Sequence, residues 1–209
     1  MYTTIAVIDD DVYIGNMLEE VLTREGYQVL RAYSGTEALL LLEQRKADVI
    51  LLDLMLPGLS GEEILPKLKE TPVIVISAKI DVEDKVKVLL DGAADYLTKP
   101  FDTKELLARI TVQLRKQENK KEEILKVSRG FFIEQGYEKT SMRQIAAAAD
   151  VSLGLVAYHF KTKRDIALEI VQRMYHRLSS SLVSWHLSCR SSRRHSKSGH
   201  GLTGRCLQP

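Results

Sequence analysis

Short apolar runs alternate with longer amphipathic segments along the first 117 residues. The runs are rich in β-branched residues and predict strands, whereas the segments between them have the spacing of helices with one apolar face. The expected strands are Thr4–Ile8, Gln28–Arg31, Val49–Leu52, Val73–Ile76 and Tyr96–Thr98. The expected helices are Val12–Arg24, Gly35–Gln44, Glu62–Lys69, Val82–Leu90 and one that begins at Asp102. Strands and helices in alternation favour a five-stranded parallel sheet with helices on both faces.

The middle strands of this sheet are marked by their hydrophobicity. The runs VILLD and PVIVIS are continuously apolar, as expected for strands that are covered on both faces. In sheets of this class, ligands bind at the carboxyl ends of the strands. Polar residues that directly follow a strand are therefore the first candidates for a functional site.

A second region, from about Glu122 to Tyr175, has no strand pattern. Ile124, Leu125, Phe131 and Phe132 give one helix an apolar face. The segments 140–149 and 152–160 are two short helical stretches separated by a tight turn, and another helix follows from Arg164. Two short helices on a tight turn predict a helix-turn-helix unit.

The segment between the two regions is open to two interpretations. Residues 115–123 (RKQENKKEE) are entirely polar, which is typical of a flexible linker. However, neither Gly nor Pro occurs from Phe101 to Arg129, so one helix could also run through both regions. The sequence favours neither alternative.

Periodicity is lost after about residue 178. Residues 179–209 are rich in Ser, Arg and His and contain no acid. We expect a disordered basic tail, because too little apolar surface is present to offset the entropy of ordering. It could act as a nucleic-acid arm, but we favour the product of a truncation or of a changed reading frame.

Composition fits a globular protein, with 44% apolar and 28% charged residues. The sequence shows neither a membrane-spanning run nor a signal peptide, and its two cysteines, Cys189 and Cys206, lie in the tail. A cytoplasmic location is the expectation. Residues 1–116 hold 20 acids and 14 bases, whereas residues 173–209 hold 7 bases and no acid, so the two ends should have different partners.

Carboxylates follow two of the expected strands. Asp9 and Asp10 come after the first strand and Asp53 comes after the third, so all three should converge on one edge of the sheet. Neighbouring carboxylates repel one another unless a cation neutralises them, and Mg²⁺ prefers such oxygen ligands. The simpler alternative is that Asp9–Asp11 only cap the next helix.

Two further residues favour the functional interpretation. Ser77 follows the fourth strand and Lys99 follows the fifth, so both should lie at the same edge. A lysine can balance a carboxylate or bind a phosphate as a point charge, and a hydroxyl can donate a hydrogen bond to phosphate oxygen. A cis peptide bond at Pro100 is one way to orient Lys99.

The segments VIDDD, VILLDLMLPGLSG, PVIVISA and GAADYLTKPF resemble the receiver domain of two-component response regulators over residues 1–117. The resemblance implies an α/β flavodoxin-like fold with strand order 2-1-3-4-5. It implies that Asp53 accepts phosphate from a histidine kinase, that Asp9, Asp10, Asp53 and the Met55 carbonyl bind Mg²⁺, and that Lys99 and Ser77 contact the phosphoryl group. Tyr96 matches the aromatic residue of the switch. No separate enzymatic reaction is expected beyond phosphorylation and dephosphorylation of Asp53.

Relatives with winged-helix effectors dimerise through one face of the receiver. By this resemblance, Lys85, Asp95, Glu105 and Arg109 would form salt bridges between two copies of the chain. Ala94 departs from the acid that is usual in that subgroup, which removes one pair. The alternative is a solvated charged face, because exposed ion pairs contribute only about 0–1 kcal/mol each.

The segment FFIEQGYEKTSMRQIAAAADVSLGLVAYHFKTK resembles the DNA-binding domain of TetR-type repressors, which we place at residues 118–178. The second helix of its helix-turn-helix would enter the major groove. The DNA-binding residues implied are Thr140, Ser141, Arg143, Ser152, Leu153, Leu155, Tyr158, His159 and Lys163. His159 is alternatively a core histidine. Ala157 replaces an aromatic phosphate contact of many relatives, and the long ligand-binding domain of that family is not matched here.

The leading hypothesis is a response regulator that controls transcription through DNA binding, with a histidine kinase, DNA and a second copy of the chain as partners. The alternative is a phosphate sink or protein-docking switch with an inert remnant of a DNA-binding domain. A magnesium-dependent hydrolase would explain the carboxylates, but not Ser77, Tyr96 and Lys99 together.

Overall fold

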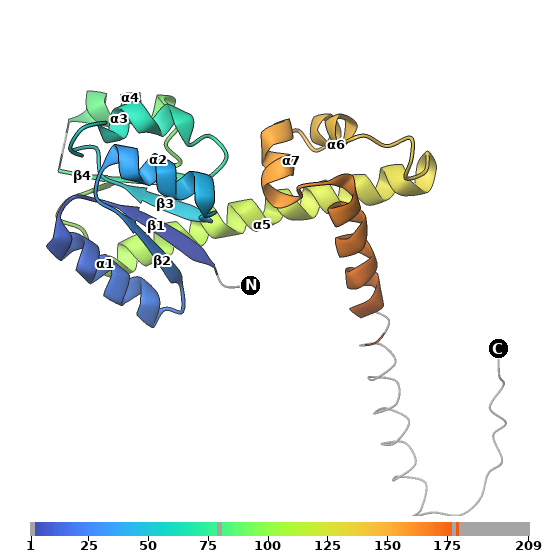
Figure 1. The fold of residues 1–209 in the computed structure, drawn as a ribbon, viewed down its shortest axis with the longest axis horizontal. Coiled ribbons are helices and arrows are strands. Elements are labelled where there is room, and N and C mark those ends of the chain that lie inside the picture. The colour runs from blue at the N-terminus through green and yellow to red at the C-terminus, as the bar shows by residue number, and fades with distance from the viewer. Residues whose placement is uncertain (1–2, 79–80, 177–178, 180–209) are drawn as a thin grey trace, which may run out of the picture.

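The protein folds into two units that share one long helix (Figure 1). The computed structural model describes residues 3–78, 81–176 and 179. We call residues 3–117 the α/β unit and residues 118–176 the helical unit. The predicted tail, including Cys189 and Cys206, lies outside the described residues apart from Ser179.

The α/β unit is built on a parallel sheet of five strands in the order β2-β1-β3-β4-β5. The strands are β1 (Thr4–Ile8), β2 (Gln28–Ala32), β3 (Val49–Leu52), β4 (Val73–Ser77) and β5 (Asp95–Thr98). The predicted strands and their order are confirmed, and each boundary moves by at most one residue. The register places Leu52 between Ile8 of β1 and Val75 of β4, so these three strands end close together.

Five helices of this unit cover the two faces of the sheet (Figure 1). They are α1 (Val12–Arg24), α2 (Gly35–Gln44), α3 (Gly61–Ile64), α4 (Val82–Leu90) and α5 (Thr103–Glu134). Successive side chains of a strand point to opposite faces. Ile5 and Val7 pack with Leu18 and Leu106 under α1 and α5, whereas Ala6 and Ile8 belong to the core on the side of α2 and α3.

The helix predicted over Glu62–Lys69 is shorter in the structure. Residues Gly61–Ile64 form α3, and Leu65–Lys67 continue as the 3₁₀ turn η1. Ser60 and Glu63 form a capping box at the start of α3. Pro66 lies in the first turn of η1, and its missing N–H prevents a regular α-helix from continuing through it.

Helix α5 is continuous over 32 residues, which decides between the two alternatives for residues 115–123. Asp102 caps its first turn by accepting a hydrogen bond from the Lys104 N–H at 2.6 Å. Its first half packs on the sheet, and its second half carries the helical unit (Figure 1). The polar stretch is thus a solvated middle segment of a helix rather than a flexible linker.

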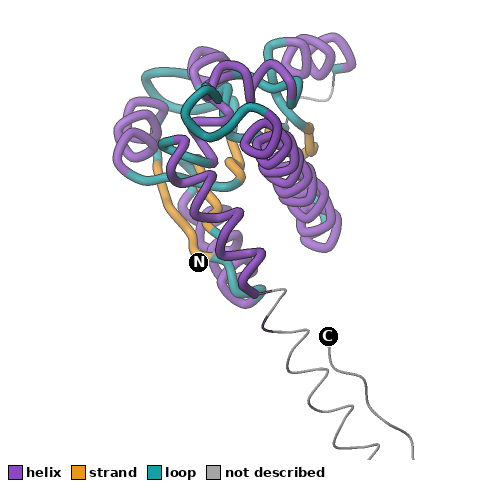
Figure 2. Tube along the Cα trace, turned by 90° about the vertical axis from the view of Figure 1, so that its right-hand side faces the viewer, coloured by secondary structure: helices purple, strands orange, loops and turns teal. Residues whose placement is uncertain are grey.

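The helical unit consists of the end of α5, α6 (Met142–Ala148), α7 (Leu153–His159) and a C-terminal helix at residues 163–176. Its core contains Ile124, Ile145, Val156, Phe160 and Ile166, all at most 5% exposed. The C-terminal helix points away from α5 toward the bottom of Figure 1, and it points downward also in the view turned by 90° (Figure 2). The helices of the described residues do not combine the length and hydrophobicity that crossing a membrane requires.

Candidate functional site

Acidic and basic side chains meet at the carboxyl edge of the sheet, as predicted. Asp9 follows β1, Asp53 follows β3, and Lys99 follows β5. The Lys99 Nζ atom lies 2.8 Å from Asp9 Oδ2 and 2.5 Å from Asp53 Oδ2. Both carboxylates are at least nine-tenths buried, so two acids share one ammonium group, which cannot neutralise both of them.

The other oxygen of each carboxylate is held by the backbone. Asp9 Oδ1 accepts a hydrogen bond from the Asp11 N–H at 2.9 Å, and Asp53 Oδ1 accepts one from the Met55 N–H at 2.9 Å. Asp11 is the N-cap of α1, so only this one of the three successive acids acts as a helix cap. The orientation of Asp9 and Asp53 is therefore fixed by local structure as well as by Lys99.

A glycine allows a loop to approach this site closely. The start of α3 runs directly against the backbone that carries Asp53. A Cβ atom on Gly61 would lie only 2.3 Å from the Asp53 carbonyl oxygen and 2.7 Å from the Leu54 Cα. Since both are backbone atoms, any side chain at residue 61 would push the loop away from the Asp53 segment.

Burial and neighbouring charges shift the pKa of Asp9, and likewise that of Lys99, in opposite directions. Burial raises the pKa of Asp9 above its usual value, and the hydrogen bond and charge of Lys99 offset this only in part. Burial would lower the pKa of Lys99, but its hydrogen bonds to Asp53 and Asp9 outweigh that effect and raise it. The charged form of Lys99 is thus favoured, whereas ionisation of Asp9 carries a cost that a further cation would reduce.

The donor set fits a magnesium ion. Asp9, Asp10 and Asp53 each offer a carboxylate oxygen, and the three oxygens lie within 4.8 Å of one another. Asp10 is exposed, and these ligands are all hard oxygen donors without nitrogen or sulfur. Such a set favours Mg²⁺ over softer transition metals.

Ser77 and Tyr96, on the neighbouring strands β4 and β5, are also buried in the α/β unit. Ser77 ends β4 and is fully buried, and Tyr96 of β5 is 9% exposed. The Lys85 Nζ atom of α4 lies 5.4 Å from the centre of the Tyr96 ring. The aromatic residue that matches the family's switch therefore points inward here, beneath the exposed surface of α4.

Three of the four charged residues predicted to form a dimer face pair with one another within the chain. Arg109 donates hydrogen bonds to both carboxylate oxygens of Asp95 at 2.8 Å, and its other nitrogens contact Glu105 Oε1. Val86 and Leu89 of α4 remain exposed nearby. The structure contains one chain, so the role of this face in a dimer stays a prediction.

The residues predicted to contact DNA at the start of α6 divide into two groups. Ser141 is the N-cap of α6 and forms a capping box with Gln144, and Arg143 is exposed. Thr140 is 2% exposed, and its hydroxyl donates to the Gly136 carbonyl at 2.9 Å. Thr140 therefore stabilises the preceding turn, and its predicted contact with DNA stays a prediction.

Helix α7 presents only part of its predicted DNA-binding surface. Ser152 caps the helix through the Leu155 N–H at 2.9 Å, and Leu153 is 42% exposed. Leu155 is buried, at 8% exposure, so it does not face solvent in this state. Tyr158 and His159 are partly buried, and the His159 Nε2 atom has no hydrogen-bond partner among the described residues. His159 therefore differs from the alternative interpretation, in which it is a core histidine whose polar atoms are hydrogen-bonded.

Lys163 is used inside the helical unit. Its ammonium group donates to the carbonyls of Tyr137 and Thr140 at 2.7 and 2.9 Å and lies 4.1 Å from the Tyr137 ring centre. Lys163 was expected to contact the DNA backbone, but here it ties the C-terminal helix to the loop before α6. Every residue has a backbone carbonyl, so no sequence pattern indicates which carbonyls a lysine will bind. The stabilising role of Lys163 inside the helical unit was therefore missed.

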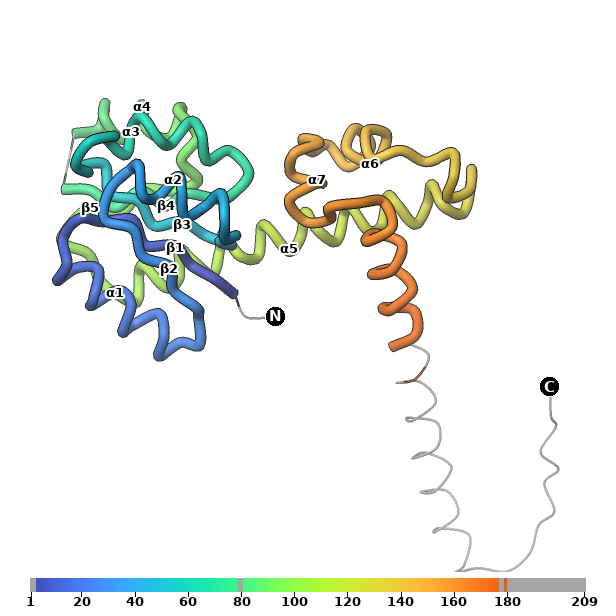
Figure 3. Tube along the Cα trace, in the orientation of Figure 1, coloured from blue at the N-terminus to red at the C-terminus, as the bar shows by residue number. Residues whose placement is uncertain are grey.

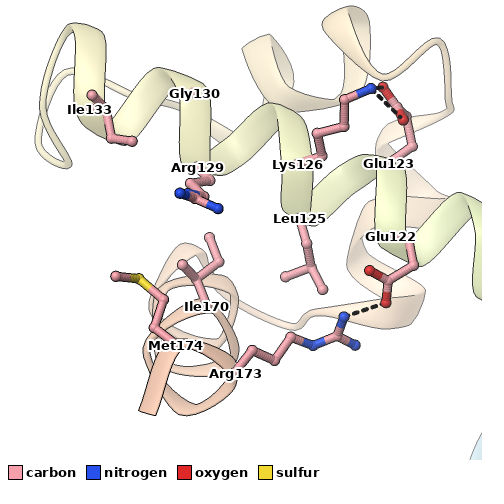
Figure 4. A pocket seen from close by; sticks show the side chains of 10 residues that line it. All are labelled: Glu122, Glu123, Leu125, Lys126, Arg129, Gly130, Ile133, Ile170, Arg173 and Met174. Atoms are coloured by element: carbon pink, nitrogen blue, oxygen red, sulfur yellow. Dashed lines mark hydrogen bonds and ion pairs between the residues drawn. The ribbon is translucent and has the colours of Figure 1, made fainter. Parts of the chain in front are cut away.

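Another contact missed from the sequence links the C-terminal helix to α5. Arg173 donates to Glu122 and to Glu169, as Figure 4 shows for the first pair. A groove of about 520 Å³ opens beside it, with Leu125, Ile170 and Met174 among its apolar walls (Figure 4). The Arg173–Glu169 pair has the helical spacing of four residues, but no sequence signal connects Arg173 to Glu122.

Comparisons with known proteins support both units. Residues 5–111 match the family described as response regulator receiver domain, and residues 124–170 match the tetR family of bacterial regulatory proteins. The chain is 44% identical over 126 residues to the uncharacterized transcriptional regulatory protein YrkP of Bacillus subtilis. The aligned residues cover 57% of this chain and 54% of that protein. The chain therefore spans about half the length of this curated relative.

Solved structures agree with the fold of the α/β unit. A response regulator receiver domain protein from Methanospirillum hungatei is 30% identical, with a TM-score of 0.55, and covers 57% of this chain and 98% of its own. A response regulator receiver domain from Francisella is 36% identical, with a TM-score of 0.53, and covers 55% and 98%. Each similarity is confined to about the first half of this chain.

Proposed function

Because the chain belongs to the response regulator family through the receiver domain of residues 5–111, we propose that it transmits a phosphorylation signal to a DNA-binding unit. In this proposal a histidine kinase phosphorylates Asp53, and the phosphorylated chain regulates transcription. The boundaries that we propose are residues 1–117 for the receiver and 118–178 for the DNA-binding domain. The observation that carries the proposal is the meeting of Asp9, Asp53 and Lys99 at one edge of the sheet.

Asp53 is the nucleophile in this account. One of its carboxylate oxygens forms a bond to phosphorus while the bond from phosphorus to the imidazole nitrogen of a phosphohistidine breaks. The products are an acyl phosphate on Asp53 and a free histidine on the kinase. Lys99, already 2.5 Å from Asp53, supplies positive charge where negative charge accumulates.

Asp9, Asp10, Asp53 and the Met55 carbonyl would hold Mg²⁺. The metal supplies charge neutralisation for the phosphoryl oxygens when it is bound. Asp9 would gain from a second cation, because burial raises its pKa even beside Lys99. The remaining chemistry of the chain is limited to phosphorylation and dephosphorylation of its own Asp53.

Ser77 and Tyr96 would report the state of Asp53. The Ser77 hydroxyl lies at the end of β4, next to the strand that carries Asp53, and can donate a hydrogen bond to a phosphoryl oxygen. Tyr96 of β5 pairs in register with Val75, two residues before Ser77. A movement of Ser77 would therefore act on the neighbouring strand and on the surface formed by α4 and α5.

That surface is the proposed homodimer face. Lys85, Asp95, Glu105 and Arg109 line it, and Arg109 would exchange its partners within the chain for partners on the second copy. Two copies would place two helix-turn-helix units on paired half-sites of DNA. The DNA contacts would come from the exposed residues Ser141, Arg143, Ser152 and Leu153, and from Leu155, Tyr158 and His159 once these are uncovered. Thr140 and Lys163 would contact DNA only after they release the carbonyl groups that they bind here.

The proposal is tested by DNA binding of the whole chain with and without a phosphodonor. Duplexes selected from a random pool serve as the probe, and acetyl phosphate with Mg²⁺ serves as the donor. We expect tighter binding of the selected duplex after phosphorylation, and no change for Asp53→Asn. If the chain is phosphorylated but binds no DNA in either state, the alternative of a phosphate sink or docking switch is correct.

A further inference from the structure

Helix α7 lies beside the α/β unit (Figure 3). It contacts the amino-terminal end of β3, because Ala47 lies two residues before this strand, whereas Asp53 directly follows the strand at its other end. The Tyr158 hydroxyl donates a hydrogen bond to the Ala47 carbonyl at 2.7 Å. The Lys46 ammonium donates to the Tyr158 carbonyl at 2.7 Å and lies 4.8 Å from the Tyr158 ring centre. Ala47 thus binds the side chain of Tyr158, and Lys46 binds its backbone carbonyl.

A second contact involves the start of α7. The Ser152 hydroxyl lies 3.3 Å from Glu70 Oε2. The Glu70 carboxylate also lies against the backbone of Gly154, where an added Cβ atom would come within 2.2 Å of Glu70 Oε1. Glu70 therefore brings a negative charge to the part of α7 between Ser152 and Tyr158.

These contacts define a basal surface, which consists of Lys46, Ala47, Asp48, Glu70 and Thr71. Burial, together with the charge of Asp48, raises the pKa of Tyr158 to about 12. The phenol therefore keeps its proton and remains a hydrogen-bond donor to Ala47 at neutral pH.

We propose that the basal surface is an autoinhibitory docking site for α7, so that the α/β unit and DNA compete for the same side of this helix. The inference rests on the proposed function, in which α7 reads DNA. It deepens that function by naming the contact that must open before DNA binds.

Competition follows from the shape and charge of the contact. The major groove admits a helix only when the reading side of the helix is free of other protein, and here Ser152, Gly154 and Tyr158 touch the α/β unit. DNA presents negatively charged phosphates to such a helix. A phosphate that approached Ser152 and Gly154 would meet the Glu70 carboxylate, which carries the same sign of charge, so the α/β unit and DNA would exclude each other.

The contact is weak enough to be reversible. The contacts of Ser152 and Tyr158 are hydrogen bonds, and an exchange of one hydrogen bond with water changes stability only modestly. A polar groove of about 470 Å³ lies beside it, with Lys69, Lys116, Lys120 and Asp150 in its lining. The apolar clusters of the two units share no residue. Helix α7 can therefore leave the basal surface without opening either core, although Leu155, which is buried beside this groove, would become exposed.

The opening motion must pass through α5, because this helix connects the two units without interruption. Lys116, Glu118, Asn119 and Lys120 are exposed, so a bend there breaks few packing contacts. Asp48 directly precedes β3 and Thr71 lies two residues before β4, the strands whose ends carry Asp53 and Ser77. The same two strands therefore connect the phosphorylation site with the basal surface.

The test uses the full chain with Lys46→Ala and Glu70→Ala combined. This variant removes one base and one acid from the basal surface and leaves every residue of α7 in place. The matched control combines Glu20→Ala and Arg24→Ala, which removes an exposed ion pair on α1 without changing the net charge. The probes are hydrogen exchange of the α7 amides and affinity for a duplex selected from a random pool.

We expect the basal-surface variant, without a phosphodonor, to bind the selected duplex about tenfold tighter than the wild type, because the open form is more populated. Its α7 amides should exchange faster, whereas the control pair should match the wild type in both. Equal α7 exchange and equal DNA affinity in all three proteins would overturn the inhibitory contact and leave the proposed function intact. Failure of every form, phosphorylated or not, to enrich any duplex would instead overturn the proposed function, and the inhibitory role with it.

Discussion

At the scale of single residues, the site around Asp53 depends on a balance between burial and charge. Lys99 contacts both Asp9 and Asp53, and each of these acids is also held by a backbone N–H. The arrangement leaves Asp10 as the exposed acid of the cluster. The affinity for a divalent cation should therefore respond to Asp10 more than the stability of the fold does.

We predict that Mg²⁺ stabilises the wild type and does so less in Asp10→Asn. A ligand present at about one hundred times its dissociation constant adds about 3 kcal/mol to the free energy of unfolding. Thermal unfolding across a MgCl₂ titration measures this effect. Asp91→Asn, at an exposed aspartate that ends α4, is the control and should respond as the wild type does. An equal response of Asp10→Asn would remove Asp10 from the metal site.

His159 makes the stability of the chain depend on pH in the acid range. Burial, with the nearby charges of Lys121, Lys46 and Lys120, lowers its pKa to about 4, from 6.5 in the unfolded chain. Between these values the unfolded state binds a proton that the folded state does not bind. The contribution of His159 to the free energy of unfolding should therefore decrease as the pH falls from about 6.5 to about 4.

We predict that His159→Gln flattens this part of the stability profile. Urea unfolding at a series of pH values between 7 and about 4 measures the change relative to the wild type. The matched control is His176→Gln, at an exposed histidine of the C-terminal helix. The account fails here if His159→Gln and His176→Gln follow the same profile.

At the scale of elements, the strands were predictable and the interactions between the two units were not. Continuous apolar runs such as Val49–Leu52 identify central strands, because both of their faces are buried. The convergence of Asp9, Asp53, Ser77 and Lys99 followed from the rule that parallel strands end at the same edge. Both the fold of the α/β unit and the main part of its site were therefore accessible from the sequence.

The sequence carried less information about the helical unit and its contacts. The middle of α5 is polar because water surrounds it, and a solvated helix and a linker have similar compositions. The Tyr158–Ala47 and Lys163–Tyr137 contacts use backbone carbonyls, which every residue has. Leu155 was expected to face DNA, yet it is buried beside the groove between the units. Tertiary contacts of this kind leave no periodic signal.

We predict that Asn119→Pro uncouples the two units. Proline within a helix removes a hydrogen bond and clashes with the preceding turn, at a cost of about 3 kcal/mol. Phosphorylation of Asp53 should continue at the wild-type rate, while DNA affinity should lose its dependence on the phosphodonor. Asn119→Ala keeps the helix and is the control. A phosphodonor response that survives Asn119→Pro would show that a continuous α5 is not needed.

At the scale of the whole molecule, the proposed signal passes from the carboxyl edge of the sheet to a dimer face and to the basal surface. Phosphorylation would favour exchange of the Arg109 partners, Asp95 and Glu105, between two copies of the chain. Dimerisation would also bring two helix-turn-helix units together once α7 is released. Dimerisation increases DNA affinity because it doubles the number of contacts. Release of α7 increases it because the DNA-binding side of this helix is uncovered.

We predict that the phosphorylated chain sediments as a dimer and that Arg109→Ala raises its dimer dissociation constant about tenfold, as for a central arginine of an interface. Sedimentation velocity with and without acetyl phosphate measures this change. Arg24→Ala, which breaks an exposed pair on α1, is the control and should dimerise like the wild type. A phosphorylated wild type that remains monomeric would contradict the dimer face.

The central claim is that Asp53 accepts the phosphoryl group, and the intact mass of the chain after incubation with acetyl phosphate and Mg²⁺ tests it most directly. The account predicts the addition of one phosphoryl group to the wild type and to Asp11→Asn, since the side chain of Asp11 caps α1. It predicts no addition to Asp53→Asn. A phosphoryl group on Asp53→Asn, or none on the wild type, would contradict the account.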